Sequence, residues 1–370
     1  MSTSSAARWQ SSAARLLASA AVAALVGLLC APASNHRALA QSAATPAPAA
    51  KETCVTCHVG IGNSYSHAPM RHAMEQPGQN PVLDTHPNLT VQLGKYSYSI
   101  QTRDGKSTYS VTDGADTLTL PIRWIFGIHT QTWVLEKDGH LYESFVSYFP
   151  RDNGLDITPG DTRLKPTNLT EAMGRRIPTW ETLQCFNCHA SGAVSGVQLT
   201  LDTLRPGLDC ERCHIGANQH MTDAEHDNYS TLPRSLKKMT SEDVSNFCGQ
   251  CHRTWDTVMR NHWKGPAFVR FQPYRLESSK CFIGNDPRIS CLACHNPHEQ
   301  LKHDAAFYDS KCLACHAQAK TVASTQYKAC PVAKANCTSC HMPKVELPGG
   351  HAPFTDHWIR ISHPGDPYPG

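Results

Sequence analysis

Apolar and polar residues alternate along residues 89–120 in the way that half-buried strands require. The apolar members of this alternation stand at every second position on either side of a short break: Val91, Leu93, Tyr96, Tyr98 and Ile100. Asp-Gly pairs, which are typical of tight turns, follow at 104–105, 113–114 and 138–139. The pattern predicts a small antiparallel β element over residues 89–149, inside a β-rich insert over residues 89–166.

After Thr167 the pattern changes to short helical stretches that Pro and Gly interrupt. The run Ser241-Glu242-Asp243-Val244 is typical of a helix start, and the helix that it predicts continues past Cys251 toward His262. No long helix or sheet dominates, and apolar side chains are too sparse for a conventional core of this size. We therefore expect a mostly α chain with little regular structure, whose interior is filled by something besides side chains.

The N-terminal residues have the layout of an export signal. Two arginines, an uncharged stretch over residues 16–30 and the small-residue triplet Ala38-Leu39-Ala40 follow one another. They predict a signal peptide over residues 1–40 and an Ala- and Pro-rich linker over residues 41–52. A buried N-terminal helix is the alternative, whereas the bulky residue before Cys30 disfavours a lipid anchor. No later apolar run reaches the roughly 20 residues that a spanning helix needs, so we expect no transmembrane span after signal removal.

The charge balance excludes one class of partner. The chain has 34 Lys plus Arg and 31 Asp plus Glu, a formal net charge of +3. Removing residues 1–40 takes away three arginines and no acid, which leaves 31 basic and 31 acidic residues. Such a balance gives no basis for nucleic-acid binding.

The 17 Cys and 21 His are the informative part of the composition. Fourteen of these Cys and seven of the His form the pattern Cys-x-x-Cys-His, which scattered residues would almost never produce by chance. The seven copies are Cys54, Cys57 and His58; Cys185, Cys188 and His189; Cys210, Cys213 and His214; Cys248, Cys251 and His252; Cys291, Cys294 and His295; Cys312, Cys315 and His316; and Cys337, Cys340 and His341.

Two thiols at this spacing can add to the two vinyl groups of one heme, and the adjacent His then ligates the iron. Zinc is the competing interpretation, but a zinc site does not require His after the second Cys. We therefore expect seven covalently bound c-type hemes with these seven His as proximal iron ligands. The isolated first copy predicts a heme module over residues 53–88, and the other six predict a six-heme domain over residues 167–370.

Seven macrocycles would supply the missing apolar volume. The expected fold class is accordingly mostly α with little regular structure, a heme-packed multiheme cytochrome c fold with a small antiparallel β insert. Two Cys of the mature chain, Cys281 and Cys330, are left over. A disulfide between them, two free buried thiols, and a contact near a heme all remain open.

Each iron can accept a sixth ligand, and thirteen His outside the signal and the seven copies compete for at most seven places. His220 and His298 lie in short segments just after a copy, and His262 would share a helix face with His252 if that helix persists. Met70 and Met74 are possible thioether ligands near the first copy. The expected distal ligands are His129, His220, His262, His298, His351 and His357, together with His67 or His72, of which we favour His67.

Three segments carry a resemblance to a known family: Arg270-Phe-Gln-Pro-Tyr-Arg-Leu276, Cys-Leu-Ala-Cys-His-Asn-Pro-His298 and Cys-Thr-Ser-Cys-His-Met-Pro-Lys344. The chain resembles the multiheme cytochromes c related to the tetraheme cytochrome of nitrifying bacteria, a superfamily that includes hydroxylamine oxidoreductase and the pentaheme nitrite reductase. Residues 124–160 also resemble a portion of environmental multiheme proteins. The resemblance implies closely stacked hemes, largely bis-His ligation and periplasmic electron transfer.

The chain departs from these relatives at the catalytic positions. All seven copies end in His, whereas the nitrite reductases usually carry Cys-x-x-Cys-Lys at the catalytic heme. No Tyr matches the cross-linking Tyr of hydroxylamine oxidoreductase, so the resemblance implies no particular catalytic activity.

Three functions are compatible with these patterns. The first is a periplasmic electron carrier that exchanges electrons with redox-partner proteins such as a quinol-side donor, a terminal reductase or other cytochromes. The second is an oxidoreductase that acts on a small nitrogen or sulfur oxyanion at one open heme, with Arg270, Arg275 and His262 as candidate charge-stabilising groups. The third is a subunit of a larger cytochrome assembly. We favour the electron carrier, and an oligomer is compatible with it.

Overall fold

The computed structural model describes residues 51–317, 330–363 and 365–368, and these residues belong to one compact unit. The predicted signal peptide and nearly all of the predicted linker lie outside the described residues. Along the described ranges, no helix combines the length and the apolar character needed to cross a membrane.

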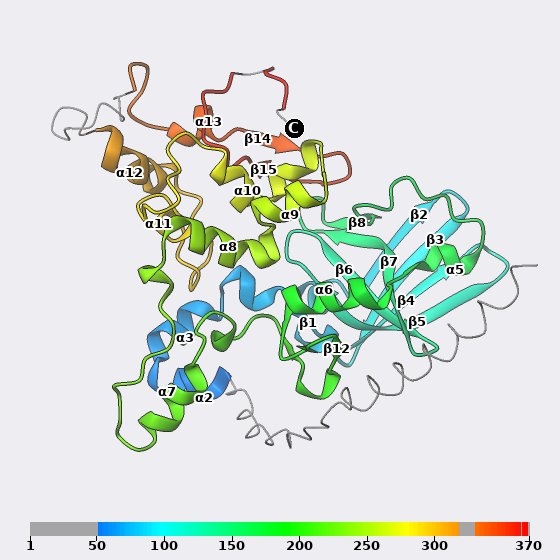
Figure 1. Cartoon of the computed structure of the whole chain (residues 1–370). Coiled ribbons are helices and arrows are strands. Elements are labelled where there is room, and N and C mark those ends of the chain that lie inside the picture. Colours follow the sequence, from blue (N-terminus) through cyan, green and yellow to red (C-terminus); the bar gives the residue numbers. More distant parts are fainter. Residues whose placement is uncertain (1–50, 318–329, 364, 369–370) are drawn as a thin grey trace, which may run out of the picture. The chain divides into compact units, whose positions relative to one another are not determined.

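The largest element is an antiparallel sheet of nine strands (Figure 1). Strands β2 to β8 lie side by side in chain order, while β1 pairs with β5 and β9 pairs with β7. Their bounds are β1 Met74–Glu75, β2 Asn88–Leu93, β3 Tyr96–Arg103, β4 Lys106–Thr112, β5 Thr117–Phe126, β6 Gln131–Lys137, β7 His140–Phe149, β8 Gly154–Ile157 and β9 Gly174–Arg176.

One face of this sheet buries large aromatic side chains. Tyr98, Tyr109 and Trp133 are fully buried, and their rings meet edge to face at centroid distances of 6.1 Å. Each of these side chains stabilises the fold by about 3–5 kcal/mol relative to alanine. The sheet therefore has a protein core of its own.

The fold-class prediction is wrong because the sheet is far larger than a small insert. Strands β1 and β9 lie outside residues 89–166, in segments where two or three residues are too short to show an alternating pattern. Apolar side chains are also concentrated in the strands, so they build a conventional core there. The turn signals, by contrast, were read correctly, since Gly105, Gly114 and Gly139 all have positive φ and connect neighbouring strands.

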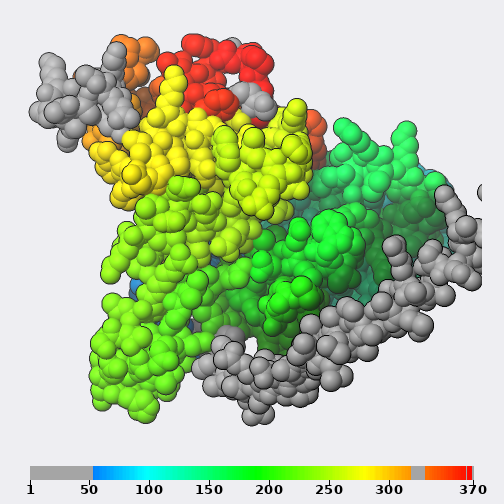
Figure 2. Space-filling model, viewed as in Figure 1, coloured from blue at the N-terminus to red at the C-terminus, as the bar shows by residue number. Residues whose placement is uncertain are grey.

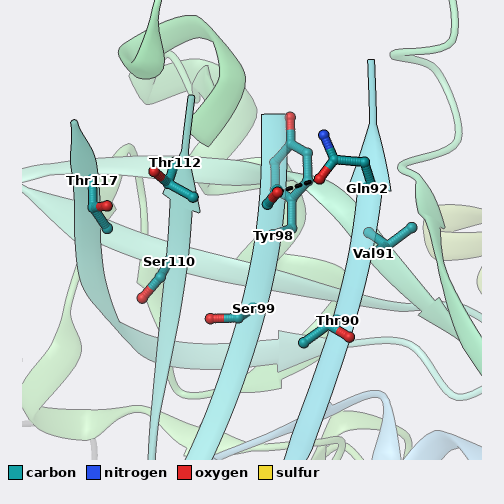
Figure 3. Close-up of a pocket in the computed structure, with 9 residues that line it drawn as sticks. Thr90, Val91, Gln92, Tyr98, Ser99, Ser110, Thr112 and Thr117 are labelled. Carbon is teal, nitrogen blue, oxygen red and sulfur yellow. Dashed lines mark hydrogen bonds between the residues drawn. The ribbon is translucent and has the colours of Figure 1, made fainter. Parts of the chain in front are cut away.

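The opposite face of strands β2 to β5 is covered by short polar side chains (Figure 3). Thr90, Ser99, Ser110 and Thr119 are cross-strand partners in one row, and the hydroxyls of Ser110 and Thr119 hydrogen-bond at 2.8 Å. This face lines a shallow hollow of about 450 Å³. None of the Cys-x-x-Cys-His copies contributes to the hollow, so we place the functional site elsewhere.

One glycine at the sheet edge predicts a stability effect. Gly174 begins β9 with φ 147°, and a Cβ on it would overlap the carbonyl oxygen of Glu143 in β7. We expect Gly174→Ala to lower the free energy of unfolding by about 1–3 kcal/mol more than Gly94→Ala, which also has positive φ but has open space around it. Denaturant unfolding of both variants tests this, and equal losses would contradict it.

Outside the sheet the chain forms short helices and two-stranded ribbons. The α-helices are α2 Lys51–Cys57, α3 Val59–Tyr65, α4 Pro81–Thr85, α5 Leu169–Met173, α6 Thr179–His189, α7 Ala217–Ala224, α8 Ser241–His252, α9 Trp255–Arg260, α10 Gln272–Glu277, α11 Cys291–Cys294, α12 Ala305–His316 and α13 Cys337–His341. The 3-10 helices are η1 Pro69–His72, η2 Pro77–Gln79, η3 Leu201–Thr203, η4 Cys210–Arg212, η5 Leu236–Lys238 and η6 Pro266–Arg270. The ribbons pair β10 Ala190–Ser191 with β13 Arg205–Pro206, β11 Val194–Ser195 with β12 Gln198–Leu199, and β14 Lys344–Glu346 with β15 Pro353–Thr355.

Helix α8 begins at Ser241 as predicted, with the Thr240 side chain accepting a hydrogen bond from the Asp243 N–H. It does not continue toward His262. The helix ends at His252 because Arg253 adopts φ 70°, which no α-helix accommodates. His262 is exposed and follows the separate helix α9, so the predicted shared helix face with His252 is wrong.

Candidate functional site

Every Cys-x-x-Cys-His copy lies on one turn of helix. The copies occupy the C-terminal ends of α2, α6, α8 and α12, the 3-10 helix η4, and the short helices α11 and α13. In each, the two Cys stand three residues apart on one helix face, as attachment to a single macrocycle requires. The His backbone N–H closes the turn, for example from His58 to Cys54 at 3.0 Å and from His295 to Cys291 at 2.8 Å.

Three of the copies place their His opposite a second imidazole from a distant part of the chain. The ring centroids are 6.3 Å apart for His58 and His220, 5.9 Å for His214 and His298, and 6.2 Å for His295 and His357. In each pair the first His belongs to a copy and the second was expected as a distal ligand. The sequence did not show which would face which.

The separation of these rings fits one metal ion between them. A metal–nitrogen bond of about 2 Å on each side, plus the radii of the two rings, puts two ligating imidazoles about 6 Å apart between centroids. The three measured separations all match that value. Direct stacking of aromatic rings also spans this range, so the orientation of the ring nitrogens has to be considered as well.

Hydrogen bonds hold four imidazoles by the Nδ1 atom, two of them from these pairs and two from other motif copies. Nδ1 lies 2.7 Å from the Ala73 carbonyl in His189, 2.7 Å from the Thr231 carbonyl in His220, 3.0 Å from the Arg360 carbonyl in His341, and 3.0 Å from the Thr355 carbonyl in His357. A carbonyl oxygen accepts a hydrogen bond from Nδ1–H, and in this tautomer Nε2 is unprotonated and available to a metal. Motif His and candidate distal His are thus both oriented in a way that suits ligation.

Burial keeps several of these rings neutral. Desolvation lowers the pKa of His189, His252, His295 and His298, and lowers the pKa of His357 to about 4 with a smaller contribution from the nearby His295. Neutral imidazole is the form that ligates a metal.

The motif cysteines lie in contact across copies. Side-chain contacts join Cys54 to Cys210, Cys188 to Cys251, Cys248 to Cys291, and Cys312 to Cys337. All sixteen Cys of the described ranges are free thiols, including Cys281 and the exposed Cys330. These contacts join the first copy to the third, the second to the fourth, the fourth to the fifth, and the sixth to the seventh.

Large apolar side chains directly after the copies are exposed. Val59 and Ile215, each next to a motif His, are both 54% exposed. Tyr229 and Leu232 are also exposed, in the loop beyond α7 that stands at the surface (light green in Figure 2). A porphyrin bound at the adjacent copies would cover apolar surface of this kind. Together with the ring pairs, this shows that the residues present fit heme.

Contacts from the first copy's neighbourhood fix its position against the third copy. The buried Tyr65 hydroxyl donates to the Leu208 carbonyl at 2.7 Å, and the Arg71 guanidinium donates to the Pro206 carbonyl at 2.8 Å. These bonds join two segments far apart in sequence. They bring His58 to the helix α7 that carries His220.

Other predicted ligands have different surroundings. His351 faces two carboxylates, Asp152 through Nδ1 and Asp156 through Nε2 at 2.9 Å, and packs on the Phe149 ring. His129 is exposed in the turn between β5 and β6. The structure brings neither of them opposite a motif His.

The two candidate distal ligands near the first copy, His67 and His72, also differ in their surroundings. Both ring nitrogens of His72 are engaged, Nδ1 with Glu75 at 2.6 Å and Nε2 with the Ser66 carbonyl at 2.7 Å. His67 is exposed at the end of the α3 segment. Met74 is fully buried in an apolar cluster with Trp124 and Phe186, and Met70 is half-buried. The geometry thus favours His67 over His72.

Sequence reasoning missed the residues that orient the ligands. The Ala73 carbonyl accepts hydrogen bonds both from His189 and from the Gly127 N–H, and the Phe126 ring stacks on His189 at 4.8 Å. These contacts join the end of β5 to the second copy. No local pattern marks a backbone carbonyl as a ligand support, so only the fold could identify it.

The structure excludes Arg275 as a charge-stabilising group for a substrate. Arg275 is 2% exposed and forms a buried pair with Asp356, whose oxygens accept from it at 2.7 and 2.8 Å. The positive charge of Arg275 is thus paired with the Asp356 carboxylate. Arg270 lies over the Phe354 ring at 5.8 Å. Arg275 is therefore a structural residue and is not available to a substrate.

Within the ranges that the structure describes, no three His, Cys, Asp or Glu side chains group closely enough to hold a metal ion. The ring pairs described above offer two ligands each. A heme iron could accept two protein ligands of this kind besides its macrocycle.

Comparison with known families identifies part of the chain. Residues 163–215, which include the second and third copies, match the family described as Cytochrome c554 and c-prime. The match supports the prediction of a c-type cytochrome, a class of protein in which heme is attached covalently through Cys. The number of hemes stays a prediction.

One solved structure, described as the outer cell wall cytochrome OcwA, is also similar to the chain. The two are 13% identical, with a TM-score of 0.30, over 54% of this chain and 36% of that chain. The chain thus spans about a third of the length of that structure. No curated protein matches the chain.

Proposed function

We propose that the chain is an exported heptaheme c-type cytochrome that carries electrons between partner proteins. Seven Cys-x-x-Cys-His copies would each attach one heme, with the seven motif His as proximal ligands. The observation that carries the proposal is the set of three imidazole pairs at 5.9–6.3 Å, which support bis-His iron. His220, His298 and His357 are the distal ligands that this geometry favours.

The chain's own residues would hold and orient the hemes. The Cys pairs anchor each macrocycle, carbonyls such as those of Thr231 and Thr355 fix the distal rings, and buried surroundings exclude water. The heme supplies a reversible one-electron change at iron. Two imidazoles at one iron leave no coordination position for a substrate, which favours an electron carrier.

The alternative is a multiheme oxidoreductase that reduces or oxidises a small nitrogen or sulfur oxyanion at one open heme. It needs an open iron with cationic groups beside it. The burial of Arg275 against Asp356 removes one of the cations proposed for that role. We therefore keep the electron carrier as the main proposal.

The proposed location is the periplasm or another extracytoplasmic compartment, since covalent heme attachment takes place there and the N-terminal sequence is typical of a signal peptide. The proposed partners are a quinol-side donor, a terminal reductase or other cytochromes. The module boundaries at residues 53–88, 89–166 and 167–370 belong to the same proposal.

Heme stoichiometry is the first test. We expect the intact mass of protein purified from the periplasm to equal the chain from Gln41 plus seven heme groups, with all seven retained after acid denaturation because they are covalent. The oxidised protein should give a predominantly low-spin electron paramagnetic resonance (EPR) spectrum. Six or fewer hemes, or heme lost on denaturation, would overturn the proposed stoichiometry, and a substantial high-spin signal would favour the oxidoreductase.

A further inference from the structure

Arg212 lies between the two Cys of the third copy, at the end of η4. Its guanidinium reaches the second copy, where Nη2 donates to the Asn187 carbonyl at 2.8 Å and to the Asn187 side-chain oxygen at 3.0 Å. Asn187 itself stands between Cys185 and Cys188. One side chain therefore bonds two positions inside the neighbouring attachment turn.

The same guanidinium also contacts the fourth copy. It hydrogen-bonds the thiol of Cys251, which in turn contacts Cys188, while the Cys188 sulfur lies 3.8 Å from the Gln250 carbonyl. The second, third and fourth copies thus meet at the Arg212 guanidinium.

Nearby acids do not neutralise this charge. Asp209 and Glu211 both pair with Arg205. Over the described ranges, no carboxylate forms an ion pair with Arg212, and its hydrogen bonds go to the uncharged Asn187 and to Cys251. A second cation, Arg253, acts on the same pair of thiols.

We propose that Arg212 is a positioning residue that holds the second, third and fourth attachment turns together and raises the reduction potentials of the hemes bound there. The inference rests on the proposed heme function. Reduction adds one negative charge at a heme, so an uncompensated cation at the junction stabilises the reduced form. Arg212 is half-buried, which strengthens the effect because less water screens its charge.

The test is a potentiometric titration of the full-length holoprotein, followed by visible absorbance and by EPR. We expect Arg212→Gln to shift up to three of the seven reduction steps to lower potential while every heme stays attached and low-spin. Arg212→Lys keeps the charge but loses the fork that bonds Asn187 twice, so it should restore most of the shift. Arg260→Gln is the matched control, since Arg260 pairs with Asp256 at the surface.

Titrations of Arg212→Gln that coincide with those of the control would overturn the inference, as would an Arg212→Lys variant shifted as far as Arg212→Gln. If Arg212→Gln fails to assemble, the Arg212→Lys variant alone tests the inference. Its reduction potentials should then lie close to those of the wild type. Failure of the heme proposal is recognised separately. In that case the wild type itself lacks seven low-spin hemes, and no variant is needed to see it.

Discussion

Replacing His298 with alanine is expected to convert one of the seven proposed hemes to high spin and to leave all of them attached. The His298 ring lies nearly parallel to His214, at 10° and 5.9 Å, so its loss removes the distal ligand of the third site. The thiols and the proximal His are untouched, and covalent attachment does not need the sixth ligand. EPR of the oxidised protein should show one high-spin site, and intact mass should be unchanged apart from the substitution.

Two hydrogen bonds at His298 involve its backbone and not its imidazole. The Ser64 hydroxyl donates to the His298 carbonyl at 2.6 Å, and the Asn296 side chain accepts from the His298 N–H at 3.1 Å. Both bonds involve the backbone, so they persist in the alanine variant. The turn should keep its shape while the imidazole alone is lost.

Two other histidines serve as controls. His351→Ala should leave all irons low-spin, because the structure gives both ring nitrogens of His351 carboxylate partners. His363, which is 74% exposed at its side chain and lies beside Asp366, should also have no effect. A fully low-spin His298→Ala variant would contradict the pairing with His214 and make the turn after Cys294 structural. A high-spin His351→Ala variant would restore His351 as a ligand.

Replacing Asp356 with alanine will destabilise the protein by about 3–5 kcal/mol, because it removes the carboxylate that pairs with the buried Arg275 guanidinium. Asp356 is fully buried and also accepts hydrogen bonds from the Trp358 N–H at 3.1 Å and from Arg360 at 2.6 Å. His357 lies between these residues. We therefore expect the heme at the His295 site to lose its distal ligand in the same variant.

Denaturant unfolding and EPR check this prediction, with Asp256→Ala as the control. Asp256 also pairs with an arginine, but its side chain is 60% exposed and that of Arg260 is 77% exposed. Removing an exposed pair costs less than about 1 kcal/mol. Similar midpoints for the two variants would show that Asp356 does not carry the stability assigned to it.

The Arg275–Asp356 pair also predicts how the stability of the protein changes with pH. Burial raises the pKa of Asp356, but hydrogen bonds from Arg275 and from the Trp358 N–H outweigh burial and leave the pKa below its ordinary value. A lowered carboxyl pKa contributes stability above the ordinary value of about 4, and that contribution is lost as the pH falls through the folded-state pKa. Acid should thus weaken the wild type and leave Asp356→Ala less affected.

Local patterns in the sequence were sufficient for several features. The attachment turns need only five consecutive residues, and the helix start at Ser241 needs one capping side chain, so both can be read without knowledge of the fold. His220, His298 and His357 were among the expected distal ligands because each lies close in sequence to a copy or to the end of the chain. The match of residues 163–215 to a cytochrome family agrees with the motif-based interpretation.

Other features depend on contacts between distant segments. The pairing of His58 with His220, and the meeting of three copies at Arg212, depend on hydrogen bonds between distant segments, such as the one from the Tyr65 hydroxyl to the Leu208 carbonyl. Strands β1 and β9 exist only because β5 and β7 offer them partners, so the size of the sheet could not be read from alternation. His351 was predicted as a ligand, yet its partners Asp152 and Asp156 lie in another part of the chain.

The sequence by itself determined the positions at which we expect hemes to attach and the His expected on the proximal side, because thiol addition and proximal ligation use neighbours within one helical turn. Only the tertiary structure decided which second imidazole faces His58, His214 and His295, how large the sheet is and which carboxylate pairs with Arg275. The physical reason is that these features arise from packing between segments far apart in the chain. Their short local sequences are compatible with several partners, and burial against one of them selects the outcome.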